Sequence, residues 1–519
     1  MNLKRSPWQP SSGSLGASAV TALERDQIAD VCVIGAGMAG LLTALELVER
    51  GRSVIVLERD GVAAGETCAT TAHLTTLLDT RYFALSSMHG PDAARLVATS
   101  HMRGIAHLER VANAYAIDCD FRRVSGFLCA DNAAQAEILA REFHAATQAG
   151  ISCELVRRAP LPIARGPALH VPHQAEFDPL AFLAGVVRAL RREGVPIFAP
   201  VTVQAFDPVS ASDQIGIFTR EGRCIRANYV VVATNTPIND IVAMHTKQAA
   251  YRSYAIALAI PELMPVLAWD LEEPYHYVRT GVHPRSGRRL LIAGGEDHKV
   301  GQDTNGDNHW HRLEAWLRER FPGAGELVSQ WSGQVLETSD GLGFLGRNPG
   351  QERVFIATGH SGNGMSYSAL GAELIGDLIQ GTASPFEKLY DPARKPSSLT
   401  AIGRFVRENL NVAGQYADWL GPADAQRVAD IRRGEGAVLR RGLSRVAVYV
   451  DPAGFPHEMS ASCPHLGGVV AWNSAEKSWD CPCHGSRFDC YGKVLAGPAV
   501  SDLHAAQPVS RRPAPAKAG

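Results

Sequence analysis

The chain has 519 residues, with 51 Lys and Arg against 53 Asp and Glu, and 45% of its residues are hydrophobic. Such a chain is long enough for about three globular domains, and its near-neutral charge argues against a nucleic-acid partner, which would need a basic excess. There is no apolar run long enough for a membrane-spanning helix, and no signal peptide follows Lys4 and Arg5, so we expect a cytoplasmic protein without a membrane span.

The first elements of the chain predict a βαβ unit behind an irregular lead-in of residues 1–29. An apolar strand is expected at Asp30–Ile34, and a helix with apolar residues at helical spacing follows at Met38–Glu49. A second buried strand is expected at Ser53–Leu57. This order is typical of a nucleotide-binding α/β domain.

The middle of the chain mixes helices and strands, and the last part changes to short strands and turns. The elements expected there are helices at Asp92–Tyr115, Ala133–Gln148, Pro179–Arg192 and Arg404–Leu420, strands at Val201–Phe206, Tyr229–Ala233, Leu290–Gly294, Ala437–Arg440 and Arg445–Val450, and a strand-turn-helix at Val354–Gly381. After the lead-in we predict a discontinuous α/β region at 28–395, a linker with a bridging helix at 396–428, a small all-β domain at 429–505 and a loose tail at 506–519.

A glycine fingerprint stands between the first strand and the first helix, as Gly35-Ala-Gly37-Met38-Ala39-Gly40. Its glycines permit a tight turn and a close approach of a pyrophosphate to the backbone, while the helix N-terminus supplies N–H groups and partial positive charge. Glu58 ends the second strand 18 residues after Gly40, where its carboxylate can hold ribose hydroxyls. With Arg59 beside it, Glu58 is predicted to bind a dinucleotide cofactor.

A second stretch, Gly341-Leu-Gly343-Phe-Leu-Gly346, matches the same glycine pattern. It is followed by Arg347-Asn-Pro349, where a helix would have to start, and no acidic strand end comes after it. We interpret this stretch as a glycine-rich loop and expect one dinucleotide site in the chain.

Two later motifs indicate which dinucleotide is bound. Val230–Pro237, which contains Thr234, and Val354–Met365, which contains Gly359, Gly362 and Gly364, resemble strand-to-loop signatures of FAD oxidoreductases. The order of the motifs over about residues 28–395 resembles the D-amino-acid oxidase or glycine oxidase family. This resemblance implies FAD, bound by an α/β Rossmann-type domain that is interleaved with an α+β antiparallel-sheet substrate domain.

The resemblance also implies roles for single residues. Val203 falls where the family contacts adenine through the backbone, and Gly359, Gly362, Gly364 and Met365 fall near the pyrimidine end of the flavin. A helix N-terminus there would stabilise the anionic reduced flavin. Met365 stands where the sarcosine oxidase branch has a carboxylate-binding lysine, which puts a simple amino-acid substrate in doubt.

The candidates for substrate or catalytic contact are His73, Tyr277, Arg279, Glu296 and His360. Tyr277 and Arg279 share a face of a predicted strand and could line a substrate wall, or could belong to an ordinary solvated face. Each histidine could equally be a hydrogen-bonded structural residue. Between Cys224 and Cys463 the chain has no cysteine for a cysteinyl-flavin link, so we expect non-covalent FAD, with His73 as the alternative point of attachment.

A cluster of cysteines and histidines near the C-terminus predicts a metal site. Cys463-Pro-His465 and Cys481-Pro-Cys483-His484 are separated by 15 residues, and each box offers one thiolate and one imidazole. A Rieske [2Fe-2S] centre needs two cysteines on one iron and two histidines on the other, whereas Cys2His2 ligands also suit zinc. Zinc fingers pair Cys with Cys and His with His, so the pattern favours the cluster.

The run from Cys463 to Pro498 also resembles Rieske domains as a whole, with two departures. Respiratory Rieske proteins have a disulfide between the boxes and a tyrosine that donates to a ligand cysteine. Here Gly468 leaves Cys483 without that disulfide, and Phe488 replaces the tyrosine, although Ser486 can still donate to a bridging sulfide. Fewer donors predict a lower reduction potential.

Together these patterns predict an FAD-dependent oxidoreductase with a small all-β Rieske domain. We expect it to oxidise a small organic substrate, an amine or amino-acid derivative, by hydride transfer to FAD, with electrons leaving through the cluster to a one-electron acceptor or quinone. Two alternatives stay open: an electron-transfer flavoprotein module without its own substrate, and a redox-sensing protein with a structural cluster. The sequence does not fix the substrate, the acceptor or the oligomeric state.

Overall fold

The computed structural model describes residues 5–9, 15, 20–208, 213–238, 244–262, 264–303, 306–442 and 444–506. The chain divides into two compact units, one formed by Met1–His298 and Asn308–Asn409 and the other by Lys299–Asp307 and Leu410–Gly519. Within the described residues, no helix is long and apolar enough to cross a membrane. The compact units divide between Asn409 and Leu410, inside a helix. The domain limits drawn from the sequence therefore stay predictions.

In the first unit, eight described strands form a mainly parallel sheet with the order β16-β17-β10-β1-β2-β7, extended by β9 and β8. The strands are β1 (Gln27–Ile34), β2 (Val54–Leu57), β7 (Ile197–Phe198), β8 (Val203–Pro208), β9 (Ile215–Thr219), β10 (Cys224–Val232), β16 (Phe344–Arg347) and β17 (Val354–Thr358). β1 lies between β2 and β10 and is parallel to both. The strand order therefore switches from one side of β1 to the other, which leaves a crevice at the carboxyl end of β1. That crevice is where doubly wound sheets bind nucleotides.

A second sheet of the same unit has nine described strands and is antiparallel except for the β12–β4 pair. Its strands are β3 (His73–Leu74), β4 (Arg122–Cys129), β5 (Glu154–Val156), β6 (Ala168–Glu176), β11 (Gln248–Ala259), β12 (Val266–Trp269), β13 (His276–Val282), β14 (Arg289–Lys299) and β15 (Leu327–Thr338). Its strands alternate along the chain with those of the first sheet. The interleaving of an α/β sheet with an antiparallel sheet confirms the predicted fold class.

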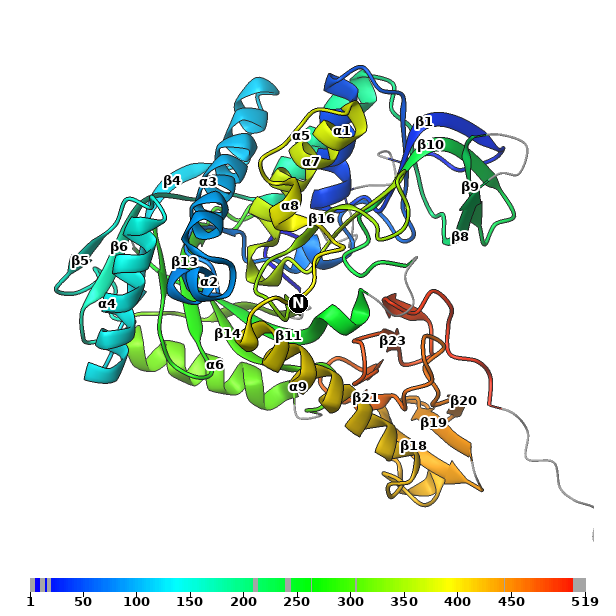
Figure 1. Ribbon diagram of the computed structural model, residues 1–519. Coiled ribbons are helices and arrows are strands. Elements are labelled where there is room, and N and C mark those ends of the chain that lie inside the picture. The colour runs from blue at the N-terminus through cyan, green and yellow to red at the C-terminus, as the bar shows by residue number, and fades with distance from the viewer. Residues whose placement is uncertain are drawn as a thin grey trace, which may run out of the picture. The chain divides into compact units, whose positions relative to one another are not determined.

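Helices cover both sheets (Figure 1). They are α1 (Met38–Glu49), α2 (Tyr82–His89), α3 (Pro91–Ala114), α4 (Ala133–Gln148), α5 (Pro179–Arg192), α6 (Gly306–Arg320), α7 (Gly364–Gln380), α8 (Glu387–Tyr390) and α9 (Leu399–Gln415), with 3-10 turns η2 (Glu66–Ala69), η3 (His245–Lys247), η4 (Ser361–Asn363), η5 (Tyr416–Trp419) and η6 (Val428–Asp430). α1 packs against α5 and α7, which lie close together in Figure 1. Because α1 is covered on several sides, its leucines at 41, 42, 45 and 47 are all buried.

The second unit contains two small antiparallel sheets, β18-β19-β20 and β21-β22-β23-β24. Their strands are β18 (Glu435–Arg441), β19 (Ser444–Val450), β20 (Pro456–Ser460), β21 (Ala471–Asn473), β22 (Ser478–Asp480), β23 (Arg487–Asp489) and β24 (Val494–Ala496). A compact core that includes Trp472, Trp479 and Phe488 joins them. The predicted small all-β domain is therefore present, whereas only Ala506 of the predicted tail lies within the described residues.

The bounds predicted for α1, α4 and α5 match those in the structure, and three other predictions were wrong in part. β10 begins at Cys224 instead of Tyr229, because its first residues pair antiparallel with β9. The bridging helix begins at Leu399 instead of Arg404 and ends at Gln415, where the chain tightens into η5. The second glycine pattern starts no helix, as predicted, but Phe344–Arg347 form β16 instead of a loop.

Candidate functional site

The glycine fingerprint forms a close-packed turn that no larger residue could make. Gly35 has a φ of +106°, and a Cβ atom built on it would lie 2.6 Å from the Ala233 carbonyl oxygen. A Cβ on Gly40 would lie 1.9 Å from the carbonyl oxygen of Gly35. The backbone is therefore bare where α1 begins, and the helix N-terminus is open to an anionic ligand.

Two side chains complete this turn. Glu58 accepts hydrogen bonds from the Ala36 N–H at 2.7 Å and the Asp60 N–H at 2.9 Å, so its carboxylate lies at the carboxyl ends of β1 and β2. Burial raises the pKa of Glu58, and these two N–H donors oppose the increase. Thr67, from the loop after β2, accepts from the Met38 N–H at 3.0 Å. These groups fit the phosphate and ribose portions of a dinucleotide.

The other predicted nucleotide contacts lie around the same turn. Val201 donates its N–H to the Glu58 carbonyl at 2.8 Å, which brings the start of β8 at Val203 beside the acid. Thr234 directly follows Ala233, whose carbonyl lies against Gly35. Arg59 pairs with Asp60 at 2.7 Å. The structure therefore brings these residues together, and their contacts with a cofactor stay predictions, as do those of Met38 and Ala39.

The C-terminal motif forms a second turn before a helix. Gly359 has a φ of +70°, and η4 then leads to the N-terminus of α7 at Gly364, where Met365 is buried. The Gly362 N–H donates to the Asp79 carboxylate at 2.8 Å. His360 stacks on Tyr367 at 5.4 Å between ring centroids, and burial lowers its pKa to about 4, so the imidazole is neutral at pH 7.

Strand β15 brings the two cofactor loops together. Its Gln334 N–H donates to Glu66 at 2.6 Å, and the Trp331 indole donates to the Ala69 carbonyl at 2.8 Å, both in the loop after β2. The end of the same strand contacts η4 in the C-terminal motif. The antiparallel sheet therefore meets both loops that the sequence assigns to the flavin.

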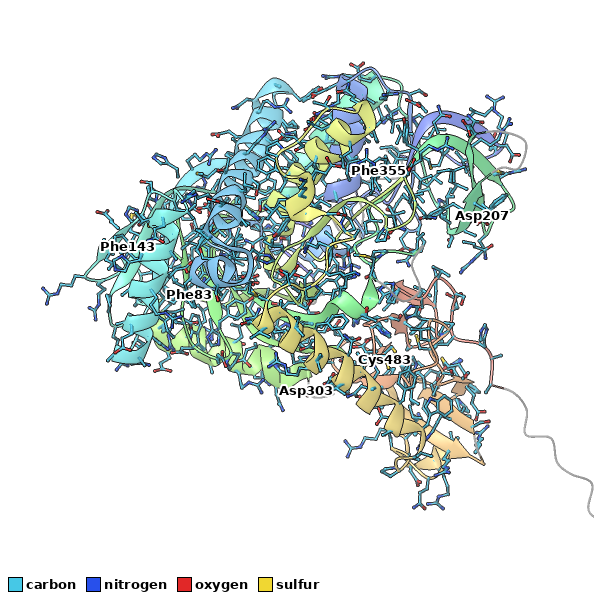
Figure 2. The ribbon with its side chains drawn as sticks, viewed as in Figure 1. Phe83, Phe143, Asp207, Asp303, Phe355 and Cys483 are labelled. Carbon is cyan, nitrogen blue, oxygen red and sulfur yellow. The ribbon has the colours of Figure 1, made fainter. Side chains whose placement is uncertain are left out.

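A cavity of about 390 Å³ opens where the end of β15 meets the C-terminal motif. Phe83 of α2, labelled in Figure 2, is one of its lining residues. Its charged lining comes from the segment before α2 and from η3, β15 and α9: Asp79, Arg81, Lys247, Glu337, Arg404, Arg407 and Glu408. The Lys247 ammonium donates hydrogen bonds to the carbonyls of Pro392 and Arg394 at 2.8 and 3.0 Å. The remaining charges of both signs suit a small ligand that carries an ammonium, a carboxylate or both.

Asp79 and Glu337 line the cavity, and Asp297 lies close enough to both for charge interactions with them. Burial, followed by the charges of Asp79 and Asp297, raises the pKa of Glu337 to about 7. Burial raises the pKa of Asp297 to about 7, and the Asp79 charge adds to the increase. A hydrogen bond from the Ser253 hydroxyl opposes the increase. Tyr275 donates to Asp297 at 3.3 Å. A nearby cation would allow all three acids to ionise.

Of the predicted catalytic residues, His73 and Tyr277 lie side by side. Their rings meet edge to face at 4.9 Å, and the ring of Tyr277 lies over Gly294 of the neighbouring strand. His73 Nε2 lies 3.3 Å from the Val278 carbonyl and Nδ1 lies 3.2 Å from the Thr71 hydroxyl. Burial and the charge of Arg279 lower the pKa of His73 to about 3, so it is neutral.

The contacts of Arg279 favour a positioning role over substrate contact. The side chain is buried, and Nη1 donates to the Thr71 and Ala72 carbonyls at 2.9 and 2.8 Å. Glu176 lies 3.4 Å from its Nε atom. The guanidinium therefore holds the loop that carries His73, and its donors point into that loop.

Glu296 also belongs to a buried network and does not join the cavity acids. Arg312 donates to it at 2.7 Å, and His276 lies 3.5 Å away. Gly295 and Glu296 have φ values of 140° and 59°, so the strand turns here and Asp297 joins Tyr275. These contacts favour a structural role for Glu296, which the sequence analysis selected as a catalytic candidate. They favour Asp297 as the acid on the substrate side.

The four predicted cluster ligands come from two loops of the second unit, in the region of Cys483 in Figure 2. The Cys463 and Cys481 side chains are buried and hydrogen-bonded to each other, which raises the pKa of Cys463. The rings of His465 and His484 meet at right angles with centroids 5.0 Å apart, and both are partly exposed. The structure thus brings the thiols together and the imidazoles together.

This pairing fits two irons better than one zinc ion. Among the described residues, Asp270, Glu272 and His276 are the only three potential ligands whose donor atoms all lie within 4.8 Å of one another. The cysteine and histidine donors therefore do not converge on one point, as the ligands of tetrahedral zinc would. A thiolate pair and an imidazole pair are what a Rieske centre requires.

The residues around the four ligands agree with the two sequence differences from respiratory Rieske proteins. A Cβ atom on Gly468 would lie 2.5 Å from the Cys483 sulfur, and Cys483 forms no disulfide. Phe488 is fully buried, and the Ser486 hydroxyl accepts from the Ala499 N–H at 3.0 Å and hydrogen-bonds to Cys463. Ser486 is therefore close to one ligand sulfur.

Sequence reasoning missed Thr67, Asp79 and Glu337, and it selected Glu296, which is the neighbour of Asp297. Thr67 lies in the loop after the acidic strand end, a position that could have indicated a phosphate contact. Asp79 and Glu337 lie 258 residues apart in the sequence. No local pattern marks them as partners, because only the packing of β15 brings them to one cavity.

Comparisons with known proteins agree with both sites. A family profile described as FAD dependent oxidoreductase matches residues 30–378, and one described as Rieske [2Fe-2S] domain matches residues 422–507. The chain is 29% identical over 489 residues to the putative Rieske 2Fe-2S iron-sulfur protein YhfW of Bacillus subtilis, covering 93% of this chain and 94% of that protein. It is 24% identical over 372 residues to gamma-glutamylputrescine oxidoreductase of Escherichia coli, covering 69% and 85%.

Solved structures share the fold of the first unit. Glycine oxidase from Geobacillus kaustophilus superposes with a TM-score of 0.58 at 21% identity, covering 72% of this chain and 100% of that one. L-proline dehydrogenase from P. horikoshii also gives 0.58, at 18% identity, with coverages of 71% and 98%. At these identities the likeness shows the fold alone.

The two sites predict cofactor losses that are independent of each other. Purified protein should contain about one FAD, two irons and two acid-labile sulfides per chain, with little zinc. Gly40→Ala should lose FAD and keep iron, because its Cβ atom would meet the Gly35 carbonyl. His465→Ala should lose iron and keep FAD, because the ligands lie in the other compact unit. Flavin absorbance and metal analysis measure both.

Gly323→Ala is the matched control, since a Cβ atom on Gly323 would meet nothing within 4 Å, and this variant should keep both cofactors. Stoichiometric zinc without a visible iron–sulfur spectrum would contradict the cluster assignment. Loss of both cofactors from each variant would show that the two sites depend on each other.

Proposed function

The chain belongs to the family of FAD-dependent oxidoreductases and carries a C-terminal Rieske [2Fe-2S] domain, and from this premise we propose that it dehydrogenates an amine or amino-acid derivative. When bound, FAD would supply the hydride acceptor, and the cluster held by the two Cys/His boxes would supply a one-electron route to an external acceptor. A relative named gamma-glutamylputrescine oxidoreductase supports this substrate class.

The observation that carries the proposal is the group of acids at the cavity. An ammonium substrate would be attracted by Asp79, Asp297 and Glu337, whose mutual repulsion a cation would relieve. An amine can lose a hydride from the neighbouring carbon only when its nitrogen lone pair is free, so the ammonium must first lose a proton. A carboxylate with a pKa near 7 can accept that proton at neutral pH.

The cavity also suits an anionic group. Arg404 and Arg407 of α9 line the cavity, and the Arg404 charge lowers the pKa of Glu337. A substrate with a carboxylate separated from its amine could engage the arginines and the acids together. This arrangement compensates for Met365, which offers no charge where a lysine would bind a carboxylate.

The alternative of an electron carrier without its own substrate requires a blocked flavin face. The cavity of about 390 Å³, which Ser361 of the C-terminal motif helps to line, argues against it. A purely structural or redox-sensing cluster needs neither the cavity nor its acids. The hypothesis of an enzyme therefore explains more features of the structure than that alternative does.

An anaerobic screen of amines and amino acids tests the proposed function. Amines that also carry a carboxylate should bleach the flavin absorbance, while the corresponding N-acylated compounds, which cannot become ammonium ions, should not. Bleaching by no member of either class would contradict the proposal and leave the carrier as the better account.

Changing Asp297 to Asn should separate substrate binding from folding. We expect D297N to raise the KM for an active amine at least about tenfold, or about 1.4 kcal/mol, because a carboxylate facing the ammonium is lost. Glu262→Gln removes the same charge from a side chain that is 90% exposed, and it should leave the KM unchanged. An unchanged KM in D297N would contradict the assignment of this acid.

The same variant has a predicted pH signature in the FAD-loaded protein without substrate. Because the folded-state pKa of Asp297 is about 7, above its ordinary value of 3.8, ionisation disfavours the folded state, and this loss of stability grows from about pH 4 to pH 7. D297N should therefore melt at a higher temperature than the wild type at pH 8, with the difference vanishing near pH 4. A difference that does not vary with pH would contradict the raised pKa.

A further inference from the structure

A short segment outside the two metal-binding boxes holds the loop of the first box. Tyr416 and Trp419 of η5 follow directly after α9. The Tyr416 hydroxyl donates to the Leu466 carbonyl at 2.8 Å, and the Trp419 indole N–H donates to the Gly467 carbonyl at 3.0 Å. Leu466 and Gly467 are the two residues directly after His465, so η5 holds two successive carbonyls beside a cluster ligand.

The η5 segment is itself fixed to the β sheet of the second unit. The Arg445 side chain, from β19, is buried and donates to the Pro422 carbonyl at 3.0 Å and to the Trp419 carbonyl at 3.3 Å. Trp419 also packs against the hydrophobic core that contains Cys463 and Cys481. The two donors are therefore part of a folded support and are positioned before a cluster binds.

The Tyr416 hydroxyl lies near the sulfur atoms as well as the loop. It is within hydrogen-bonding range of Cys483, and the Cys463 and Cys481 sulfurs are close enough for their charges to act on it. Phe488, buried in the same core, has no hydroxyl to offer.

We propose that Tyr416 and Trp419 are positioning residues for the cluster, which fix the His465 loop and stabilise the reduced cluster through donors supplied from outside the two boxes. Reduction adds negative charge to the cluster, and the negative end of a nearby carbonyl dipole opposes it. A hydrogen bond to that carbonyl withdraws part of its negative charge and favours reduction. The inference rests on the cluster assignment and is independent of the substrate.

Tyr416→Phe and Trp419→Phe test the proposal in the full-length protein loaded with FAD and iron. Each change removes one donor and keeps an aromatic ring. Each variant should disfavour one-electron reduction of the cluster by roughly tenfold, which is about 59 mV in its midpoint potential. Each should also shift the EPR spectrum of the reduced cluster, while the flavin potential stays unchanged.

Tyr491→Phe and Trp472→Phe are matched controls from the same unit. Tyr491 is 58% exposed, and the Trp472 indole N–H donates to the Glu435 carboxylate at 2.9 Å, not to a carbonyl of the first box. Both controls should keep the wild-type potential and spectrum. Cluster loss from Tyr416→Phe with FAD and fold retained would also support the proposal. Potentials and spectra in both η5 variants equal to those of the controls would overturn it, even if their melting temperatures fell.

Discussion

The buried guanidinium of Arg279 is the interaction on which the active-site side of the molecule depends. A cation removed from water is costly unless hydrogen bonds and an opposite charge compensate for it. Arg279 obtains this compensation from the carbonyls of Thr71 and Ala72 and from Glu176. Because these partners belong to the loop after β2 and to β6, satisfying the charge fixes that loop against the antiparallel sheet. His73 and Tyr277 keep their edge-to-face contact as a consequence.

The same junction explains why acids gather beside the cofactor loops. β15 reaches both the loop after β2 and the η4 turn, so its last residues, including Glu337, must lie beside the Asp79 carboxylate that accepts from Gly362. The turn at Gly295 and Glu296 brings Asp297 to Tyr275. The backbone geometry of two strands thus collects three carboxylates in a place where burial raises their pKa values.

Local patterns predicted the parts of each site that a single loop contains. The fingerprint at Gly35–Gly40 and the two metal-binding boxes are short, and their chemistry follows from residue type and spacing. The cavity acids come from strands and loops far apart in the sequence, so only tertiary packing reveals them. Arg279 and Glu296 were interpreted as catalytic because charged residues on a predicted strand resemble a substrate wall. Their partners, Ala72 and Arg312, lie too far along the chain for strand periodicity to indicate them.

The bridging segment shows the same limit in another way. An amphipathic pattern predicted one helix over Arg404–Leu420, and the change from α9 to η5 at Tyr416 went unrecognised. The tighter turn presents Tyr416 and Trp419 to the His465 loop, so the deviation from the predicted helix is where the segment contacts the cluster box. Propensity alone could not indicate this, because the partners are carbonyl groups of a loop about 50 residues away.

Whether substrate electrons reach the cluster of the same chain is best measured by EPR spectroscopy. Protein reduced anaerobically by an active amine and then frozen should show the signal of the reduced cluster together with loss of the flavin absorbance. Cys481→Ala should show the flavin change alone and should no longer reduce artificial one-electron acceptors at the wild-type rate. Full bleaching of the flavin with the cluster still oxidised, and normal turnover of Cys481→Ala with those acceptors, would contradict a role for the cluster in electron exit.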